Sequence, residues 1–553
     1  MKAAQQLGIK IPTLCFLEGV NAPSGCRMCV VEVKKARNLV PACVTAVNER
    51  MEIRTNSPVV IEARRTLMEL LLANHPNECL TCVRNRNCEL QTLAQELGIR
   101  EITYRGEVRE YPKDTSAPAL MRDPRKCVIC HRCISVCSNI QSVFALTDQF
   151  RGFKTLVGPA FGEKLADTEC VQCGQCVLVC PVAALQEQDD TDKVWQALAD
   201  PQKHGIVQTA PAVRVQLGET MGMPPGSIVI GQMVARLRRL GFDRVFDTNF
   251  ATDVTIMEEG HEFLERLKKG GPFPMFTSCC PAWIKFAETF YLQLLDNISS
   301  CKFPQQVFGP VAKTYYAQKM GIDPKDIVVV SIMPCTAKKF EAQRPEMKAS
   351  GYRDVDIVLT SRELGRMFKQ ANINLATLPE EQFDEPLGIS TGAAAIFGTT
   401  GGVMEAALRT VANVVAGQDL PQFEYTQCRG LEGVKEATCN INGTEVKIAV
   451  VHGLANTRNL LEKILAGEVH YHFVEVMACP GGCIGGGGSF IPTDTEIRRQ
   501  RMEAIYEVDR RLPIRKSHQN PAIKALYEEF LEQPLSHRSH ELLHTHYTPR
   551  TIR

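Results

Sequence analysis

Residues 326–341 read DIVVVSIMPCTAKKFE, and this stretch decides the fold class of the larger part of the chain. The β-branched run that ends at Met333 predicts a buried strand, and the segment after Cys335 has the composition of a helix. A strand that leads directly into a helix is typical of an open α/β sheet, in which ligands bind beyond the carboxyl ends of the strands. Cys335 therefore lies where such a sheet would bind a ligand.

Two further segments place cysteines after a short strand-like run. An apolar run over 274–277 precedes one cysteine pair, and a strand-like run over 472–477 precedes another. These two pairs are Cys279 with Cys280 and Cys479 with Cys483. Because ligands gather at the carboxyl edge of such a sheet, we expect cysteines from three distant segments to converge on one site.

Cysteine is the most informative residue type, with 23 copies in 553 residues. Fifteen lie at or before Cys180, the next is Cys279, and the acidic stretch QEQDDTDK (186–193) lies between the two groups. A disulfide scaffold is a poor fit, because the chain is long enough for an ample core and its first residues lack a signal-peptide pattern. We expect reduced cysteines that bind metal.

Composition excludes several other classes of protein. The chain is 44% hydrophobic and 23% charged, with a formal net charge of +1. This apolar content argues against disorder, and the balanced charge gives no electrostatic basis for binding nucleic acid or acidic lipid. No stretch has the roughly 20 apolar residues of a membrane helix. We expect a cytoplasmic protein without membrane insertion.

The spacing C-x2-C-x2-C-x3-C occurs twice, over 127–137 and over 170–180. This is the pattern of ferredoxins with two [4Fe–4S] clusters, in which the fourth cysteine ligates the other cluster. The first cluster would be held by Cys127, Cys130, Cys133 and Cys180. The second would be held by Cys170, Cys173, Cys176 and Cys137.

Cys15, Cys26, Cys29 and Cys43 are spaced C-x10-C-x2-C-x13-C around a turn-rich loop. Turn formers let backbone N–H groups point at cluster sulfurs, which favours a [2Fe–2S] cluster. The alternatives are free thiols and a zinc site, although zinc sites usually have two compact pairs. Such a fold normally begins with a β-hairpin of about 30 residues, but only fourteen residues precede Cys15, so we expect either a truncated start or missing first strands.

His75, Cys79, Cys82 and Cys88 form H-x3-C-x2-C-x5-C. Local spacing alone fits a zinc site and a [4Fe–4S] cluster equally well, and the cluster-rich surroundings favour the cluster. An imidazole ligand lowers the negative charge around the irons and raises the reduction potential. Four accessory clusters, one [2Fe–2S] and three [4Fe–4S], would then form an electron wire.

A chain of electron-transfer clusters must end at a site that uses or supplies the electrons. The α/β domain has four further candidate ligands for such a site: Cys280, Cys335, Cys479 and Cys483. Together the predicted sites use twenty ligands, one of them His75. Four cysteines then remain, namely Cys279, Cys301, Cys428 and Cys439. We expect the last three to be small buried core residues.

Three segments resemble, in order, the signature motifs of the catalytic domain of the [FeFe] hydrogenases: TSCCPAW (277–283), MPCTAKKFE (333–341) and EVMACPGGCIGGGG (475–488). The upstream modules resemble those of the long, multi-cluster members. The loop NAPSGCRMC (21–29) is similar to subunits of NAD(P)-linked and possible electron-bifurcating complexes. The family's third motif usually continues with Gln-Pro, where this chain has Ser489 and Phe490, and we expect a different local turn there.

The resemblance implies an H-cluster, in which a [4Fe–4S] cubane is joined through one cysteine sulfur to a diiron unit. That unit carries CO, cyanide and a dithiolate, and dedicated maturases assemble it. On this chain the resemblance assigns the cubane to Cys280, Cys335, Cys479 and Cys483, with Cys483 as the bridge.

The resemblance also implies roles around the diiron unit. Lys338 would donate a hydrogen bond to a cyanide, although its spacing from Glu341 alone predicts an ordinary helix pair. Met333, Met477 and Phe397 would form dry walls, and Gln305 would supply a hydrogen bond. Methionine and phenylalanine side chains are more often ordinary core residues.

A proton route is implied as well, and the resemblance assigns it to Cys279, Glu259, Ser299, Glu262 and Arg266. Cys279 would be the first relay, because it adjoins a ligand without being needed as one. The two glutamates and the arginine share one face of a helix predicted over 253–269. By periodicity alone this is a solvated face, since further charges crowd the helix: Glu258, Glu265, Lys268 and Lys269.

We expect five segments along the chain. They are a [2Fe–2S] ferredoxin-like domain (1–58), a [4Fe–4S] domain with one histidine and three cysteine ligands (59–105), a two-cluster ferredoxin domain (106–190), an α/β catalytic domain with two lobes of parallel-type sheet around the H-cluster (191–495), and a C-terminal helical segment (496–553).

The resemblance implies an oxidoreductase that interconverts 2H⁺ + 2e⁻ and H₂, exchanging electrons with ferredoxin or an NAD(P)-linked partner subunit. FGTTGG (397–402) lacks the G-x-G-x-x-G fingerprint, so a nicotinamide site would lie on the partner. The alternatives are a hydrogenase-like iron–sulfur assembly or electron-transfer protein and a hydrogen sensor. Cys279 and Lys338 argue against the former, and the sequence shows no appended signalling domain that would indicate the latter.

Overall fold

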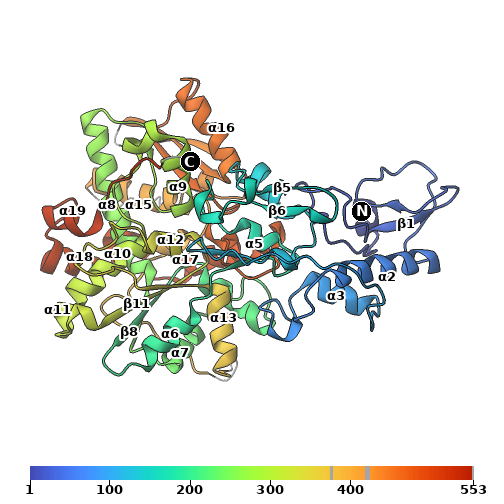
Figure 1. Ribbon diagram of the computed structural model, residues 1–553. Coiled ribbons are helices and arrows are strands. Elements are labelled where there is room, and N and C mark those ends of the chain that lie inside the picture. Colours follow the sequence, from blue (N-terminus) through green and yellow to red (C-terminus); the bar gives the residue numbers. More distant parts are fainter. Residues whose placement is uncertain (374–377, 418–423, 442, 551–553) are drawn as a thin grey trace. The chain divides into compact units, whose positions relative to one another are not determined.

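The computed structural model describes the chain except residues 374–377, 418–423, 442 and 551–553 (Figure 1). The described residues form two compact units, each with its own interior. The first unit comprises Met1–Cys170 and Gln175–Gln186. The second comprises Val171–Gly174 and Glu187–Arg553.

Short elements joined by long turns build the first unit. Its helices are α1 (Lys2–Gln6), α2 (Pro58–Ala73), α3 (Glu89–Glu96), α4 (Arg132–Ser135) and α5 (Gln175–Val179). Its strands are β1 (Val30–Val33), β2 (Val40–Pro41), β3 (Ile53–Arg54), β4 (Leu120–Arg122), β5 (Thr147–Gln149), β6 (Leu156–Gly158) and β7 (Leu185–Glu187). They form small sheets in the orders β2-β1-β3, β4-β7 and β5-β6. The turns between these elements carry most of the cysteines.

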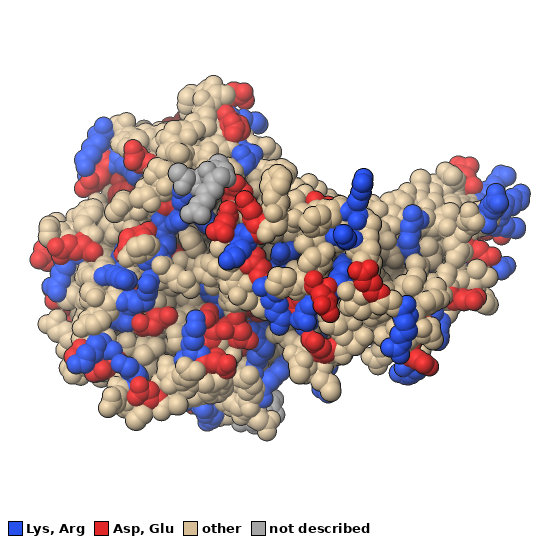
Figure 2. Space-filling view, in the orientation of Figure 1, with Lys and Arg blue, Asp and Glu red and all other residues tan. Residues whose placement is uncertain are grey.

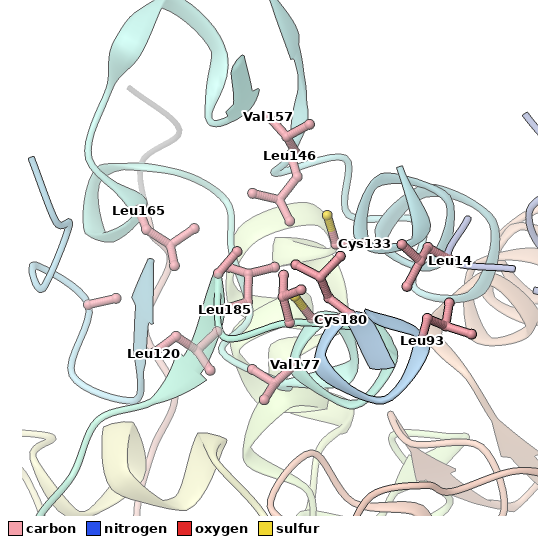
Figure 3. Packing of buried hydrophobic residues seen from close by; sticks show 14 of the residues in the cluster. Leu14, Leu93, Leu120, Cys133, Leu146, Val157, Leu165, Val177, Cys180 and Leu185 are labelled. Carbon is pink, nitrogen blue, oxygen red and sulfur yellow. The ribbon is translucent and has the colours of Figure 1, made fainter. Parts of the chain in front are cut away.

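The core of the first unit is assembled around cysteine sulfurs. Leucine and valine side chains from distant turns, among them Leu14, Leu146 and Val177, lie in one cluster with Cys133 and Cys180 (Figure 3). A core of this size is small for so long a segment, so bound clusters would add to its stability in the folded state.

The second unit is an α/β structure with two four-stranded sheets. One has the order β12-β11-β8-β9 and is parallel throughout, and the other has the order β10-β15-β14-β13, with only β13 antiparallel. Their strands are β8 (His204–Thr209), β9 (Arg244–Asp247), β10 (Met275–Phe276), β11 (Ile327–Met333), β12 (Ile357–Thr360), β13 (Val434–Ile441), β14 (Thr444–His452) and β15 (Phe473–Met477). The expected α/β class with two parallel-type lobes is confirmed.

Helices cover both sheets, and α6, α7 and α13 lie together beside β8 and β11 in Figure 1. The helices of this unit are α6 (Thr191–Ala199), α7 (Ile230–Leu240), α8 (Thr248–Lys269), α9 (Pro281–Phe290), α10 (Pro304–Val311), α11 (Ala317–Met320), α12 (Ala337–Ala342), α13 (Ser361–Gln370), α14 (Gly392–Ile396), α15 (Gly402–Ala416), α16 (Leu454–Leu465), α17 (Thr495–Arg511), α18 (Pro521–Leu526) and α19 (His537–Leu543). None of the described helices is long and apolar enough to cross a membrane.

Helix α8 buries part of its charged face, while Glu265, Lys268 and Lys269 near its C-terminal end are exposed. It begins at Thr248, where the Asp247 side chain caps the backbone N–H of Asn249, and it ends before Gly270. Glu258 and Glu259 are almost fully buried, because α10 and α15 both pack against the helix. Periodicity fails here because burial on several sides removes the contrast between a wet and a dry face.

Charges of both signs are interspersed over the visible surface (Figure 2). This distribution agrees with the formal net charge of +1. The face in view therefore offers no extended basic surface of the kind that binds nucleic acid.

Candidate functional site

Four cysteines of the second unit meet at the carboxyl ends of strands. Cys280 follows β10 and precedes α9, Cys335 follows β11, and Cys479 and Cys483 follow β15. Burial raises the pKa of the Cys335 thiol to about 12, and the charges of Cys280 and Cys483 act in the same direction. Such coupling requires neighbouring sulfurs, so the structure brings the three predicted segments together.

Glycines allow the backbone to close around these sulfurs. A Cβ at Gly488 would lie 2.9 Å from the Cys335 nitrogen, and one at Gly486 would collide with the Pro334 carbonyl oxygen. The Ala478 N–H also points at the Cys280 sulfur over 3.4 Å. Backbone this close leaves thiols and amides as the groups that line the pocket, which suits a cluster that needs N–H donors.

The segment Val171–Gly174 also packs against this pocket. The Thr336 hydroxyl donates to the Gln172 carbonyl over 2.7 Å, and a Cβ at Gly487 would collide with the Cys173 carbonyl oxygen. The charge of Cys173 contributes to the raised pKa of Cys479. One cysteine of the second ferredoxin motif therefore lies next to the catalytic-domain cysteines within the same unit.

Lys338 is a buried cation beside the sulfurs. Its Nζ lies 3.5 Å from Glu341 Oε2 and 5.5 Å from the centre of the Phe303 ring. Burial acts to lower the pKa of Lys338, but Glu341 and the sulfurs of Cys335 and Cys483 outweigh it and hold the pKa above its ordinary value. The helix pair expected from spacing exists, and it is part of the pocket rather than of the surface.

Gln305 lies on the far side of that pair. Its amide nitrogen donates to Glu341 Oε2 over 2.8 Å and to the Lys338 carbonyl over 3.3 Å. Its buried Oε1 has no hydrogen-bond partner among the described residues. Burial raises the pKa of Glu341 to about 7, although Lys338 and Arg344 oppose the rise.

The three residues expected to wall the diiron unit are all buried. Met333 is the last residue of β11, and Met477 is the last residue of β15. Phe397 and Met477 belong to the same apolar cluster as Cys279, against which Cys280 and Cys483 pack. Phe397 and Met477 thus bring apolar, polarizable side chains next to Cys279, Cys280 and Cys483.

The predicted proton route is a continuous set of neighbours. The Ser278 N–H donates to Glu259 over 3.3 Å, and the Ser299 hydroxyl donates to Glu262 Oε2 over 2.8 Å. Arg266 donates to Glu262 Oε1 over 2.7 Å. Side-chain exposure rises from nothing at Ser299 to about an eighth at the Glu262–Arg266 pair, so the chain leads outward from the core.

Electrostatics link the inner end of that route to Cys279. Burial raises the pKa of Glu259 to about 8, with a further increase from the charge of Glu262, while hydrogen bonds from Ser278 and Ser299 oppose it. Burial and the charge of Glu259 raise the pKa of the Cys279 thiol well above its ordinary value. A thiol and a carboxyl group that both favour their protonated forms can hold a proton in a dry interior.

Glu475 was missed by sequence reasoning. It is fully buried on β15 and accepts hydrogen bonds from the Gly401 and Met404 N–H groups, over 2.6 and 2.8 Å, at the start of α15. Its charge contributes to the raised pKa values of Cys279 and Glu259. A lone acidic residue in the apolar run HFVEVM was the signal that could have revealed it.

In the first unit, two cavities reproduce two predicted ligand sets. One is lined by His75, Cys79, Cys82 and Cys88. The other is lined by Cys127, Cys130, Cys133 and Cys180, the crossed set of the ferredoxin pattern. Lys126 Nζ lies 3.6 Å from the Cys82 sulfur, so a cation faces the first cavity.

The remaining cysteines of the first unit interact with one another in smaller groups. Hydrogen bonds link the sulfurs of Cys15 and Cys26 and those of Cys29 and Cys43, and the first lowers the pKa of Cys26 to about 5. Cys137, Cys170 and Cys176 interact electrostatically. In the described N-terminal residues no strand precedes β1.

Three cysteines were expected to be core residues. Cys301 and Cys428 are buried, whereas Cys439 is only half-buried because it lies on the edge strand β13. None of the 23 cysteines forms a disulfide. Among the described residues, no three His, Cys, Asp or Glu side chains are placed so that they could hold one metal ion. The prediction of clusters is therefore supported by cavities that several cysteines line and by electrostatic interactions between thiols.

Comparison with known proteins agrees with this geometry. The model of the iron only hydrogenase large subunit, C-terminal domain, matches residues 203–487, and that of the iron hydrogenase small subunit matches 495–550. The chain belongs to the iron-only, or [FeFe], hydrogenase family. Three further models match upstream: a 2Fe-2S iron-sulfur cluster binding domain (1–58), the NADH-ubiquinone oxidoreductase-G iron-sulfur binding region (64–103) and a 4Fe-4S binding domain (167–186).

Individual members of the family are similar over the full chain. The NADP-reducing hydrogenase subunit HndD of Solidesulfovibrio fructosivorans is 52% identical, covering 100% of this chain and 96% of its own. Iron hydrogenase 1 of Clostridium pasteurianum is 42% identical, and the match covers 99% of this chain and 96% of that protein. The structure of apo [FeFe]-hydrogenase HydA1 from Chlamydomonas reinhardtii superposes with a TM-score of 0.60 at 44% identity, covering 66% of this chain and 99% of that one. This chain is an iron hydrogenase with accessory iron–sulfur domains.

Proposed function

We propose that this hydrogenase interconverts protons and H₂ at an H-cluster in the second unit. The observation that carries the proposal is the connected set from Cys279 through Glu259, Ser299 and Glu262 to Arg266, which joins the four-cysteine pocket to the outside of the core. A pocket that only stored or passed electrons would not need a proton route.

The residues present fit an H-cluster. Cys280, Cys335, Cys479 and Cys483 would hold its cubane, with Cys483 shared with the diiron unit. When bound, the cluster supplies a redox-active iron site at which H₂ is formed or split. Lys338 would donate a hydrogen bond to a cyanide from its buried, charged amino group. Gln305 Oε1, which has no hydrogen-bond partner among the described residues, would be a polar group on the wall of the site. Met333, Met477 and Phe397 exclude water.

Protons would move between Cys279 and the surface. The thiol passes a proton to Glu259, whose pKa near 8 lets it act as acid and base around neutral pH. Ser299 hands the proton on to Glu262, and the Arg266 guanidinium holds that carboxylate in place. The Ser299–Glu262 step is a direct hydrogen bond of 2.8 Å.

Electrons would reach the H-cluster along one [2Fe–2S] and three [4Fe–4S] clusters. Cys173 lies beside Cys479, which supports the second ferredoxin cluster as the last donor. The ligand sets are Cys15, Cys26, Cys29 and Cys43; His75, Cys79, Cys82 and Cys88; Cys127, Cys130, Cys133 and Cys180; and Cys170, Cys173, Cys176 and Cys137.

The electron partner would be an NAD(P)-linked subunit, with ferredoxin as the alternative. Support comes from the 52% identity to a subunit named for NADP reduction, and from the lack of a dinucleotide fingerprint in this chain. We propose a cytoplasmic location and assembly of the diiron unit by dedicated maturases.

Hydrogen evolution from reduced methyl viologen tests this function directly. The full chain is produced together with the maturases, and its rate is compared with that of the Cys279→Ser variant. We expect turnover in the wild type and none in the variant, at equal iron content. Wild-type protein with a full complement of iron but no H₂ would instead support an assembly or electron-transfer protein.

A further inference from the structure

The C-terminal tail is paired with the loop that carries the proton route. The Thr545 N–H donates to the Ser300 carbonyl over 2.8 Å, and the Lys302 N–H donates to the Leu543 carbonyl over 2.7 Å. His544 lies opposite Cys301 in this short antiparallel bridge. The pairing fixes the imidazole of His544 next to Ser300, which neighbours the relay residue Ser299.

A hydrogen-bonded chain runs from buried Glu258 to Glu262 through this imidazole. His544 Nε2 lies 3.1 Å from Glu258 Oε2, and its Nδ1 lies 2.8 Å from the Ser300 hydroxyl. That hydroxyl is also 3.3 Å from Glu262 Oε2, the oxygen that accepts from Ser299. Glu262 is therefore a branch point with a second neighbour besides Arg266.

The arrangement determines which nitrogen of His544 is free to accept a proton. Burial acts to raise the pKa of Glu258, but hydrogen bonds from His544, Tyr527 and Ser539 hold it below its ordinary value. An ionised Glu258 accepts the Nε2–H of the neutral imidazole, and Nδ1 is then a lone-pair acceptor for the Ser300 hydroxyl.

A proton on Glu262 can leave through this chain without any redox change. It moves to the Ser300 oxygen while the Ser300 hydroxyl proton moves to His544 Nδ1. Glu262 becomes a carboxylate, His544 becomes an imidazolium paired with Glu258, and Ser300 remains a hydroxyl. The sequence runs equally well in the opposite direction.

The chain ends at His544, because its two ring nitrogens are directed at Glu258 and Ser300. Tyr527 and Ser539 donate to Glu258 from the elements on its other side. The exposed His540 on α19 packs beside the His544 ring, with the ring centres 4.3 Å apart. Burial and the charge of His544 lower the pKa of His540, while the charges of Glu258, Glu262 and Glu265 oppose this.

We propose that Ser300 and His544 form a second arm of the proton relay at Glu262, which takes up a proton, holds it on His544 against Glu258 and returns it, while Arg266 marks the first arm, which leads outward. The inference rests on the proposed hydrogenase function, because it extends that relay. A purely structural role would be to hold the tail, and the backbone pairing at Ser300 and Lys302 already does so without the imidazole.

His544→Asn separates the two roles, since its amide can keep a hydrogen bond to Ser300 but cannot carry a proton. We expect uptake and evolution of H₂ to fall about fivefold in weak buffer, less than the roughly 10²–10⁴ expected of a sole route, because the first arm remains. In the double variant of His544→Asn and Arg266→Met, the fold loss of rate should exceed the product of the fold losses of the two single variants. His537→Asn is the matched control, because it is an exposed histidine of the same helix.

Imidazole rescue and titration complete the test. Added imidazole should restore the rate of His544→Ala and leave the wild type unchanged. Histidine NMR of the full chain should show that Glu262→Gln shifts the ring signals of His544, independently of turnover. An unchanged rate in His544→Asn, without rescue of His544→Ala, would overturn the second arm. A wild type that shows the histidine coupling but no H₂ would overturn the proposed function instead.

Discussion

The two units bind their cysteines in different ways. In the first unit most of the predicted ligands lie at short spacings within turns, with Cys137 and Cys180 exchanged between the two ferredoxin repeats, and Cys79 is exposed. In the second unit four cysteines come from three strand ends and are surrounded by buried charges such as Lys338, Glu475 and Glu259. Local spacing therefore suffices for electron-transfer sites near the surface, whereas a reactive pocket depends on the topology of two sheets.

The difference also concerns electrostatics. Lys338 and Glu341 form a buried pair, and Glu475 is held by two backbone N–H groups. Removing one partner of a buried ion pair costs about 3–5 kcal/mol, because the other charge stays behind without compensation. We expect the second unit to tolerate substitutions around its cysteines much less well than the first.

The largest expected effect is on the proton route. Glu259→Gln and Cys279→Ser should each lower H₂ turnover more than about 100-fold, because each removes a proton carrier from a water-poor interior. Turnover and iron content measured on the same samples test this. Glu265→Gln is the control, because it is an exposed carboxylate of the same helix. Wild-type turnover in both relay variants would remove the route from the account.

A glycine substitution compares the packing of the two units. Gly487→Ala places a Cβ against the Cys173 carbonyl, and overpacking of this kind costs about 1–3 kcal/mol. We expect a lower thermal midpoint and loss of iron from the second unit. Gly106→Ala in the first unit meets no atom within 4 Å and should leave the midpoint unchanged. Equal midpoints for the two variants would show that the glycine contacts do not matter.

The pH dependence of stability depends on Glu259. Its pKa rises from 4.5 to about 8 on folding, so the folded chain keeps a proton that the unfolded chain releases in this range. Stability from this group is therefore lost as the pH rises from 4.5 to about 8. Glu259→Gln stays neutral, and its thermal midpoint should fall less than that of the wild type over the same window. Parallel curves would contradict the raised pKa.

The smallest expected effect on turnover lies in the first unit. His75→Cys replaces a neutral ligand by a thiolate and should lower the reduction potential of that cluster, with little change in viologen-driven H₂ evolution. Redox titration followed by electron paramagnetic resonance measures the shift. Loss of all catalysis in this variant would mean that electrons from viologen reach the catalytic site only through the cluster at residue 75.

Much of this molecule could be predicted from residue patterns. The repeated cysteine spacing predicted that Cys127 shares a cavity with Cys180, because the fourth cysteine of each ferredoxin repeat belongs with the other repeat. The strand ends at Met333 and Met477 predicted where the cysteines of the second unit meet, because sheet topology brings such ends together. The buried state of Glu258 was not predictable, because α8 is enclosed on several sides and periodicity then carries no signal. Glu475 was marked only by its place as a lone acid in an apolar run.

The C-terminal segment shows the same limit. Its helical character was expected, and α17, α18 and α19 agree with it. Its pairing with the loop at Ser300 depends on contacts across more than two hundred residues, which no local pattern encodes. Predicting such contacts requires the three-dimensional positions of both sheets and of the C-terminal segment.

Infrared spectroscopy of the full chain, produced together with the maturases, tests the central claim most directly. An H-cluster carries CO and cyanide on iron, and their stretching bands lie in a region free of protein absorption. We predict these bands in the wild type and their loss in Cys483→Ala, in which the proposed bridge between cubane and diiron unit is removed. Iron-replete wild-type protein without these bands would contradict the account, because the pocket would then hold only a cubane.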